Sequence, residues 1–184
     1  RALPMMGLGG SVGTSKEGIT AEVLVVASFD DLKKRSAQAK GKMVLFNLPF
    51  TSYRETVIVR RLGAIEAAKV GAVASLIRSV GPFSMQSPHT GNMAYDDKVK
   101  KIPHAALSLE DAEMLARMQA RGEKIKIQLK MEAHMLPDGY SRNVIADIPG
   151  REKPEEIVIV SGHIDSWDVG QGAMDDGGGC LAAW

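Results

Sequence analysis

The sequence predicts an α/β fold, because two residue patterns alternate along the chain. Short runs of β-branched and aliphatic residues, such as "AEVLVVAS" at 21–28, are typical of buried strands. Longer segments between them, such as 55–72, carry apolar residues at helical spacing. The 184 residues are 45% hydrophobic with a formal net charge of +1, which is typical of a globular protein with a core and provides no field that favours nucleic acid.

The first half of the chain supplies the clearest elements. Apolar runs predict strands at 21–28, 42–47 and 73–79. "FDDLKKRSAQAKG" predicts a helix that ends at Gly41, and the amphipathic stretch 55–72 predicts a second helix. Each helix follows one strand and precedes the next, so the pattern indicates strands that lie in one sheet.

The second half begins with a long loop over 81–101, rich in Gly, Pro, Ser and Asn. A strand is expected at 102–108, and a helix follows, which Ser108 and Asp111 begin with an approximate capping box. "KIKIQLKM" at 124–131 alternates as a half-buried strand does. Residues 21–131 are therefore expected to form a self-contained α/β unit. Further strands at 141–150 and 155–166, and a helix from Gly177, would begin a second unit.

A cluster of metal-binding residue types lies at 161–179, "SGHIDSWDVGQGAMDDGGG". His163 follows the apolar strand expected at 158–161, and a neutral imidazole nitrogen is a good zinc ligand. Asp165 can accept the other ring N–H and so fix the tautomer of the imidazole. The glycine-rich turn allows the chain to return to Asp175, whose carboxylate could bind the same metal or bridge two. A bridging carboxylate suits a two-metal hydrolytic site.

Each part of this cluster also has a structural interpretation. A histidine near a strand end is more often structural than a ligand, and "DDGGG" is often a turn into a helix, where aspartate is favoured. "GQG" lacks the Lys-Ser/Thr pair of a phosphate loop. The order of strand, His-x-Asp, glycine turn and Asp-Asp-Gly is more specific than any part alone and favours the metal site.

The motif at 161–179 resembles the metal motif of the co-catalytic di-zinc exopeptidases, the family of aminopeptidases and glutamate carboxypeptidases. Stretches such as "GAIEAAKVGAVASLIRSV" and "KIPHAALSLEDAEMLARM" extend the resemblance over essentially the whole chain. The resemblance implies that His163 is a zinc ligand, that Asp175 is the bridging ligand and that Asp165 is a catalytic residue that orients His163. It also implies a cis peptide bond between Asp175 and Asp176.

The resemblance implies a domain plan as well. Residues 1–18 would be the tail of an N-terminal peptidase segment, and 19–131 would be a protease-associated (PA-like) α/β domain inserted in the peptidase domain. Residues 132–184 would begin the α/β/α di-zinc peptidase domain, which is only partly present. His89, in the loop of the inserted domain, is a candidate for substrate contact.

The implied activity is that of a zinc-dependent metallocarboxypeptidase or dipeptidase, with two Zn²⁺ ions per complete domain and dipeptides or short peptides as substrates. Three more zinc ligands and the general-base glutamate of the family have no counterpart in residues 1–184, so the chain is expected to be an inactive fragment. The alternative is a non-catalytic PA-domain interaction module with a peptidase remnant. Retention of His163, Asp165 and Asp175 together favours the enzyme.

Location and partners are implied only by the resemblance. The parent protein would be a secreted homodimer that also occurs in the lysosome, the endoplasmic reticulum and the Golgi. Nucleic acid is not expected as a partner, and no apolar run approaches the ~20 residues that a membrane span needs.

Overall fold

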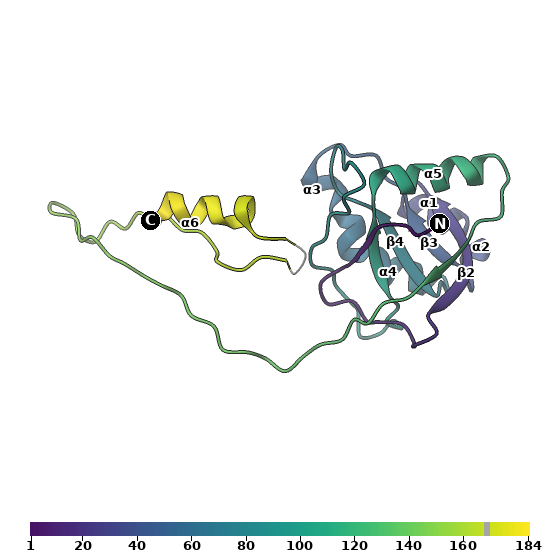
Figure 1. Cartoon of the computed structure of the whole chain (residues 1–184), viewed down its shortest axis with the longest axis horizontal. Helices are drawn as coiled ribbons and strands as arrows, with labels where there is room; N and C mark the ends of the chain where they lie inside the picture. The colour runs from purple at the N-terminus through teal and green to yellow at the C-terminus, as the bar shows by residue number, and fades with distance from the viewer. Residues whose placement is uncertain (168–169) are drawn as a thin grey trace. The chain divides into compact units, whose positions relative to one another are not determined.

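The computed structural model describes residues 1–167 and 170–184 and divides the chain into two compact units, unit 1 (Arg1–Leu136) and unit 2 (Pro137–Trp184) (Figure 1). The strands of unit 1 are β1 (Met5–Gly7), β2 (Ile19–Val26), β3 (Met43–Phe46), β4 (Ala74–Arg78), β5 (His104–Leu107) and β6 (Lys126–Leu129). Its helices are α1 (Phe29–Lys34), α2 (Ser36–Ala39), α3 (Tyr53–Thr56), α4 (Ile58–Lys69) and α5 (Leu109–Ala120). Unit 2 contains a helical turn (Ala173–Gly177) and α6 (Gly178–Ala183).

The strands of unit 1 form one mixed sheet in the order β1-β5-β4-β3-β2-β6. The four central strands, β2 to β5, are parallel, and the two edge strands are antiparallel to their neighbours. The predicted strands at 21–28, 42–47, 73–79 and 102–108 are thus confirmed as the parallel centre of an α/β sheet. Parallel strands are buried on both faces, which explains why their sequences are apolar runs and do not alternate.

Two hydrophobic clusters, one on each face of the sheet, form the core. Val26, Phe46 and Ile77 pack with residues of α1, α2 and α4 on one face. Val25 and Leu76 pack with residues of α5 on the other face. Figure 1 shows α5 crossing the sheet on its own side. Unit 1 is therefore a three-layer α/β/α arrangement.

Both long helices of the first half are interrupted where one continuous helix was expected. The first breaks at Arg35, whose φ of −106° leaves the helical region and whose Nη1 donates to the Val25 carbonyl oxygen at 2.8 Å. The second begins with the short α3, which Ser52 caps through the Glu55 N–H, and continues as α4 after Val57. The helix expected after Ser108 is confirmed as α5, with the Ser108 hydroxyl oxygen accepting from the Asp111 N–H at 3.1 Å.

Residues 1–18 lie within unit 1, and their assignment to an N-terminal peptidase segment stays a prediction. Met5–Gly7 pairs with β5 as an edge strand that the sequence analysis did not anticipate. Farther along, the Thr14 N–H donates to the Met131 carbonyl oxygen at 2.9 Å, and the Met131 N–H donates to the Thr14 hydroxyl at 3.1 Å. The segment 14–131 therefore begins and ends at neighbouring positions.

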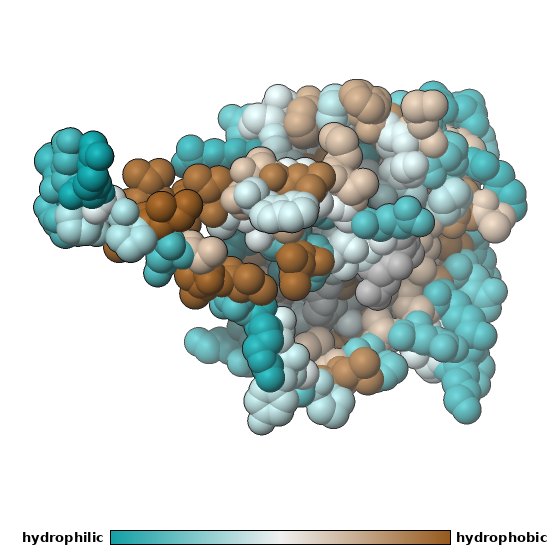
Figure 2. Space-filling model, turned by 60° about the vertical axis from the view of Figure 1, so that its left-hand side comes forward, coloured by the Kyte–Doolittle hydropathy of each residue, from teal (hydrophilic) through white to brown (hydrophobic). Residues whose placement is uncertain are grey.

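The two strands predicted in unit 2, at 141–150 and 155–166, are wrong: these residues belong to no strand. A strand needs a neighbour to satisfy its N–H and C=O groups, and the described part of unit 2 offers none. His163 and Asp165 therefore do not follow a strand end at 158–161. The apolar side chains of both segments, from Val144 and Ile145 to Ile157–Val160, are exposed, and Figure 2 shows such hydrophobic residues in brown on the molecular surface.

Among the described residues no helix has both the length and the apolar composition to cross a bilayer; α4 and α5, for example, have 12 residues each.

Candidate metal centre

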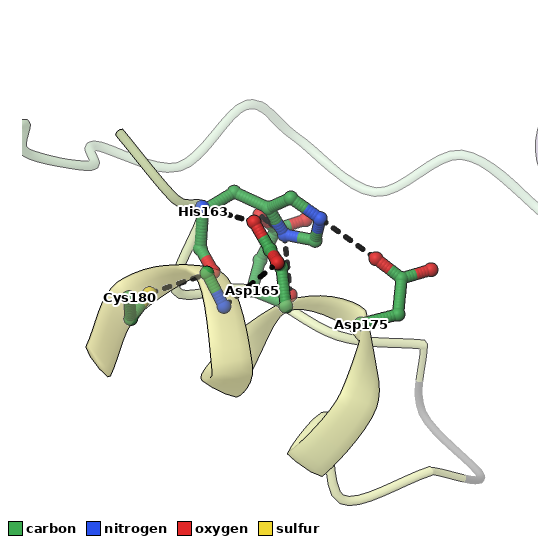
Figure 3. Close-up of polar contacts among 6 residues, drawn as sticks. His163, Asp165, Asp175 and Cys180 are labelled. Carbon is green, nitrogen blue, oxygen red and sulfur yellow. Dashed lines mark hydrogen bonds and ion pairs between the residues drawn. The ribbon is translucent and has the colours of Figure 1, made fainter. Parts of the chain in front are cut away.

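The His163 imidazole lies between two aspartates of unit 2 (Figure 3). Its Nδ1 lies 2.9 Å from the main-chain oxygen of Asp165 and 3.1 Å from the Asp165 Oδ1. Its Nε2 lies 2.9 Å from the Asp175 Oδ1. The glycine-rich chain between these residues folds back, with Gly172 at a φ of +68°, a conformation that glycine adopts at little cost. The structure thus brings together the three residues that the sequence singled out.

The surroundings of His163 favour a positive charge on or beside the ring. The Asp165 main-chain carbonyl, followed by the Asp175 carboxylate, raises the pKa of His163 above its usual value. The side chain is about half exposed, at 51%, so solvent reaches the group. Because an Nε2 lone pair and a carboxylate oxygen repel each other at 2.9 Å, either a proton or a metal cation must lie between them.

This donor set fits part of a zinc site. Zinc in proteins is bound by imidazole nitrogen and carboxylate oxygen, and a ligand histidine commonly donates its other ring N–H to a carboxylate or a carbonyl. Here Asp165 supplies both acceptors for Nδ1, which leaves Nε2 and Asp175 for the metal. In the described part of the chain no group of three or more His, Cys, Asp or Glu side chains could hold a metal ion. His163 and Asp175 therefore account for two ligands of a site that needs more.

The Asp176 carboxylate contacts the main chain of His163. The peptide bond between Asp175 and Asp176 is cis. The Asp176 carboxylate accepts from the main-chain N–H groups of His163 and Gly179, at 3.1 and 3.2 Å. The sequence predicts only the cis bond for Asp176, and the glycine run after it is the signal of a close approach of the chain there.

Cys180 contacts His163 without facing the ring. Its thiol donates to the His163 main-chain oxygen at 3.1 Å, and Figure 3 shows the sulfur on α6 beside the main chain of His163. The contact places this cysteine among the groups that hold the histidine backbone, and its sulfur is not directed toward Nε2.

The other candidate, His89, lies in unit 1. Its main-chain N–H donates to the Ser79 hydroxyl at 2.8 Å, and its ring meets the Tyr53 ring edge-on at 6.2 Å. These contacts order the loop before residue 90, and a role in substrate contact stays a prediction. A separate pocket of about 310 Å³ in unit 1 is lined by residues of the N-terminus, β4, β5 and β6, and none of the predicted site residues borders it.

The comparisons with known proteins agree on one group of peptidases. Residues 143–184 match the sequence family described as Peptidase family M28. The chain is 61% identical over 184 residues to carboxypeptidase Q of Xenopus laevis, covering 100% of this chain and 39% of that protein. The chain thus spans about two fifths of the length of this relative.

Two solved structures share the fold. A peptidase M28 precursor from Shewanella amazonensis SB2B superposes with a TM-score of 0.89 at 34% identity. The match covers 96% of this chain and 42% of the Shewanella chain. A zinc aminopeptidase from Bacillus subtilis superposes with a TM-score of 0.50 at 26% identity, covering 71% of this chain and 28% of its own. The chain is therefore a homologue of carboxypeptidase Q, and its residues 143–184 are similar to peptidase family M28.

Proposed function

We propose that this sequence forms part of a zinc-dependent exopeptidase that hydrolyses dipeptides or short peptides. The observation that carries the proposal is the His163 imidazole, fixed by Asp165 at Nδ1 and facing Asp175 at Nε2. This arrangement lies within the segment that matches the peptidase family, and the chain is a homologue of a carboxypeptidase. The remaining ligands and a general-base glutamate would come from residues outside 1–184.

The residues present would have distinct parts in this activity. Asp165 accepts the Nδ1–H of His163 and so fixes the tautomer that leaves the Nε2 lone pair available. Asp175 presents a carboxylate oxygen to the same point and would bridge two ions. When bound, zinc polarises a scissile carbonyl and lowers the pKa of a bound water to about 7.

Residues 19–131, which lie within unit 1, are proposed to form a protease-associated domain inserted into the peptidase domain. Support comes from the hydrogen bonds between Thr14 and Met131, which hold the chain shortly before residue 19 beside residue 131. A compact domain whose ends are adjacent can be inserted into a host with little rearrangement. The family match, which begins at residue 143, leaves unit 1 outside the matched peptidase segment.

From the resemblance to the di-zinc exopeptidases, the complete protein is proposed to be a secreted homodimer that also resides in the lysosome, the endoplasmic reticulum and the Golgi.

The test of the enzymatic proposal uses the complete natural chain that contains this sequence. Zinc content and dipeptide hydrolysis would be measured for the wild type and for His163→Ala, with His134→Ala, an exposed histidine of the segment before unit 2, as the matched control. We expect His163→Ala to lower kcat/KM more than about 100-fold, because even the loss of a residue that orients a ligand costs about 10–100-fold. His134→Ala should retain activity.

A wild-type protein that contains no zinc and does not hydrolyse peptides would contradict the proposal. That result would favour the interaction-module alternative, in which unit 1 binds another protein.

A further inference from the structure

The Asp176 carboxylate joins two segments of unit 2 that are far apart in sequence. Its Oδ2 accepts from the His163 main-chain N–H at 3.1 Å, thirteen residues earlier in the chain. Its Oδ1 accepts from the Gly179 N–H at 3.2 Å, in the first turn of α6. Both carboxylate oxygens are thus engaged by main-chain donors, and the group forms a bridge between the site histidine and the helix.

Two glycines leave the space that this bridge needs. A Cβ on Gly179 would collide with both oxygens of the Asp176 carboxylate. A Cβ on Gly162, the residue before His163, would collide with the main chain of Gly179 and Cys180. The positive-φ region is not the reason for glycine at either position; the reason is the close approach of the two segments. The Cys180 thiol adds a contact to the His163 main-chain oxygen at 3.1 Å.

Residues 175 and 176 therefore hold His163 at two places. Asp175 faces the ring Nε2 at 2.9 Å, whereas Asp176 accepts from the main-chain N–H of the same residue. Because the two aspartates are adjacent, the main chain of His163 is fixed relative to the Asp175 carboxylate. Metal ligands must be held in a narrow range of geometry, and groups that hold the ligands affect metal affinity strongly.

We propose that Asp176 is a positioning residue of the metal centre, which sets the distance between the His163 imidazole and the Asp175 carboxylate. The proposal rests on the proposed function, in which His163 and Asp175 bind zinc. Asp176 fixes the main-chain position of His163, whereas Asp165 fixes the orientation of its ring. The two residues therefore act on different parts of the same ligand.

A role limited to capping α6 would have a different consequence. A cap satisfies N–H groups at a helix start, and its loss lowers the stability of the helix. The bond to Gly179 alone fits that role, but the bond to the His163 N–H does not, because His163 lies outside the helix. Metal affinity distinguishes the two, since a cap has no reason to change it.

The experiment measures metal affinity in the complete natural chain with Asp176→Asn. The amide keeps the size of the side chain but replaces one acceptor oxygen with an NH₂ group, which faces a main-chain N–H and repels it. Zn²⁺ affinity would be obtained by competition with a chelator, and the d–d absorption of the Co²⁺-loaded protein would report ligand geometry. We expect affinity to fall about 10–100-fold and the Co²⁺ spectrum to change.

A second variant reaches the same bridge without changing the aspartate. Gly179→Ala should displace the carboxylate and weaken Zn²⁺ binding in the same direction. The matched controls are Asp147→Asn and Gly139→Ala, both in exposed chain of unit 2; the Gly139 Cβ would meet nothing within 4 Å. Thermal unfolding of the metal-free variants separates a loss of fold from a loss of metal.

Each outcome decides the proposal. Weaker Zn²⁺ binding in Asp176→Asn and Gly179→Ala, with unchanged binding in the controls, supports it. If the wild type binds zinc and both variants match the controls, the positioning role is overturned while the proposed function stands. If the wild type binds neither Zn²⁺ nor Co²⁺, both fall together.

Discussion

His104 is a titratable residue of unit 1 whose pKa is strongly lowered by its surroundings. The side chain is fully buried, with Nδ1 3.2 Å from the Ser75 carbonyl oxygen and Nε2 3.1 Å from the Arg60 carbonyl oxygen. Burial lowers its pKa from 6.5 to about 4, against the smaller opposite effect of these carbonyls. The ring is therefore neutral at physiological pH and donates to one of the two oxygens at a time.

This burial predicts that acid destabilises unit 1. The unfolded chain takes up a proton at His104 near pH 6.5, whereas the folded chain does so near pH 4, so the stability present above pH 6.5 declines as the pH falls toward 4. The shift corresponds to about 3 kcal/mol in the free energy of unfolding. Urea denaturation at pH 7.5, 6 and 4.5 would measure it.

The matched variants are His104→Asn, which removes the titrating group, and His134→Asn, which alters an exposed histidine. We expect His104→Asn to be less stable at neutral pH and to show a flatter pH dependence between pH 6.5 and 4. An unchanged dependence in His104→Asn would contradict the assignment.

The candidate site could be predicted at the residue scale because its chemistry is local in sequence. His163, Asp165 and Asp175 lie within thirteen residues, and glycines between them permit one compact turn. The contacts of Asp176 could not be read in this way, because they depend on the path of the main chain of Gly162 and Gly179. A residue type indicates which ligands are available, whereas main-chain contacts appear only in the structure.

At the scale of elements, α5 shows how one side chain determines where a helix begins. The buried Ser108 hydroxyl accepts from the Asp111 N–H at 3.1 Å, and Glu110 and Asp111 lie in the first turn, where the helix dipole favours acidic residues. One face of α5 packs on the sheet through Ala112 and Leu115.

Ser108→Ala should lower the free energy of unfolding by about 1 kcal/mol or more, because the Asp111 N–H loses its acceptor. Ser141→Ala, at an exposed position outside any described helix, is the matched control and should be neutral. Chemical denaturation monitored by far-UV circular dichroism would compare the two. Equal stabilities of both variants would show that the cap contributes nothing.

Elements were predictable where the sequence carries its own evidence of burial. The central strands were found because both of their faces are apolar, and β6 because Ile125, Ile127, Leu129 and Met131 alternate with polar residues. The strand β1 was missed because its three residues, between Pro4 and Leu8, form no pattern and depend on β5. The strands expected in unit 2 were wrong for the converse reason: their apolar patterns lack a neighbouring strand in the described chain.

At the scale of the whole molecule, the two units differ in how much they bury. Unit 1 has a core on both faces of its sheet. The segment 137–160 in unit 2 is exposed along its length, including Arg142, Arg151 and Lys153. Residues with few packing contacts open at little cost in free energy and are preferred sites of proteolysis.

Limited trypsin digestion of the 184-residue chain should therefore cut first after Arg142 or Arg151. A resistant product that contains unit 1 should accumulate, and mass spectrometry would identify its end. Cleavage within α4 or α5 at the same rate would contradict the assignment of unit 1 as the stable part. In the complete natural chain, protection of the same two sites would indicate that further chain covers them.

The hydrogen bonds between Thr14 and Met131 also determine how the molecule responds to force. Tension applied to the chain directly before Thr14 and directly after Met131 would act first on these two bonds. Next in line is the antiparallel pair of β2 and β6, loaded at Ile19 and Leu129, the ends nearest the pull. An antiparallel pair pulled apart from adjacent ends breaks one bond at a time, so unit 1 would unzip from this edge at low force while its parallel centre stays intact.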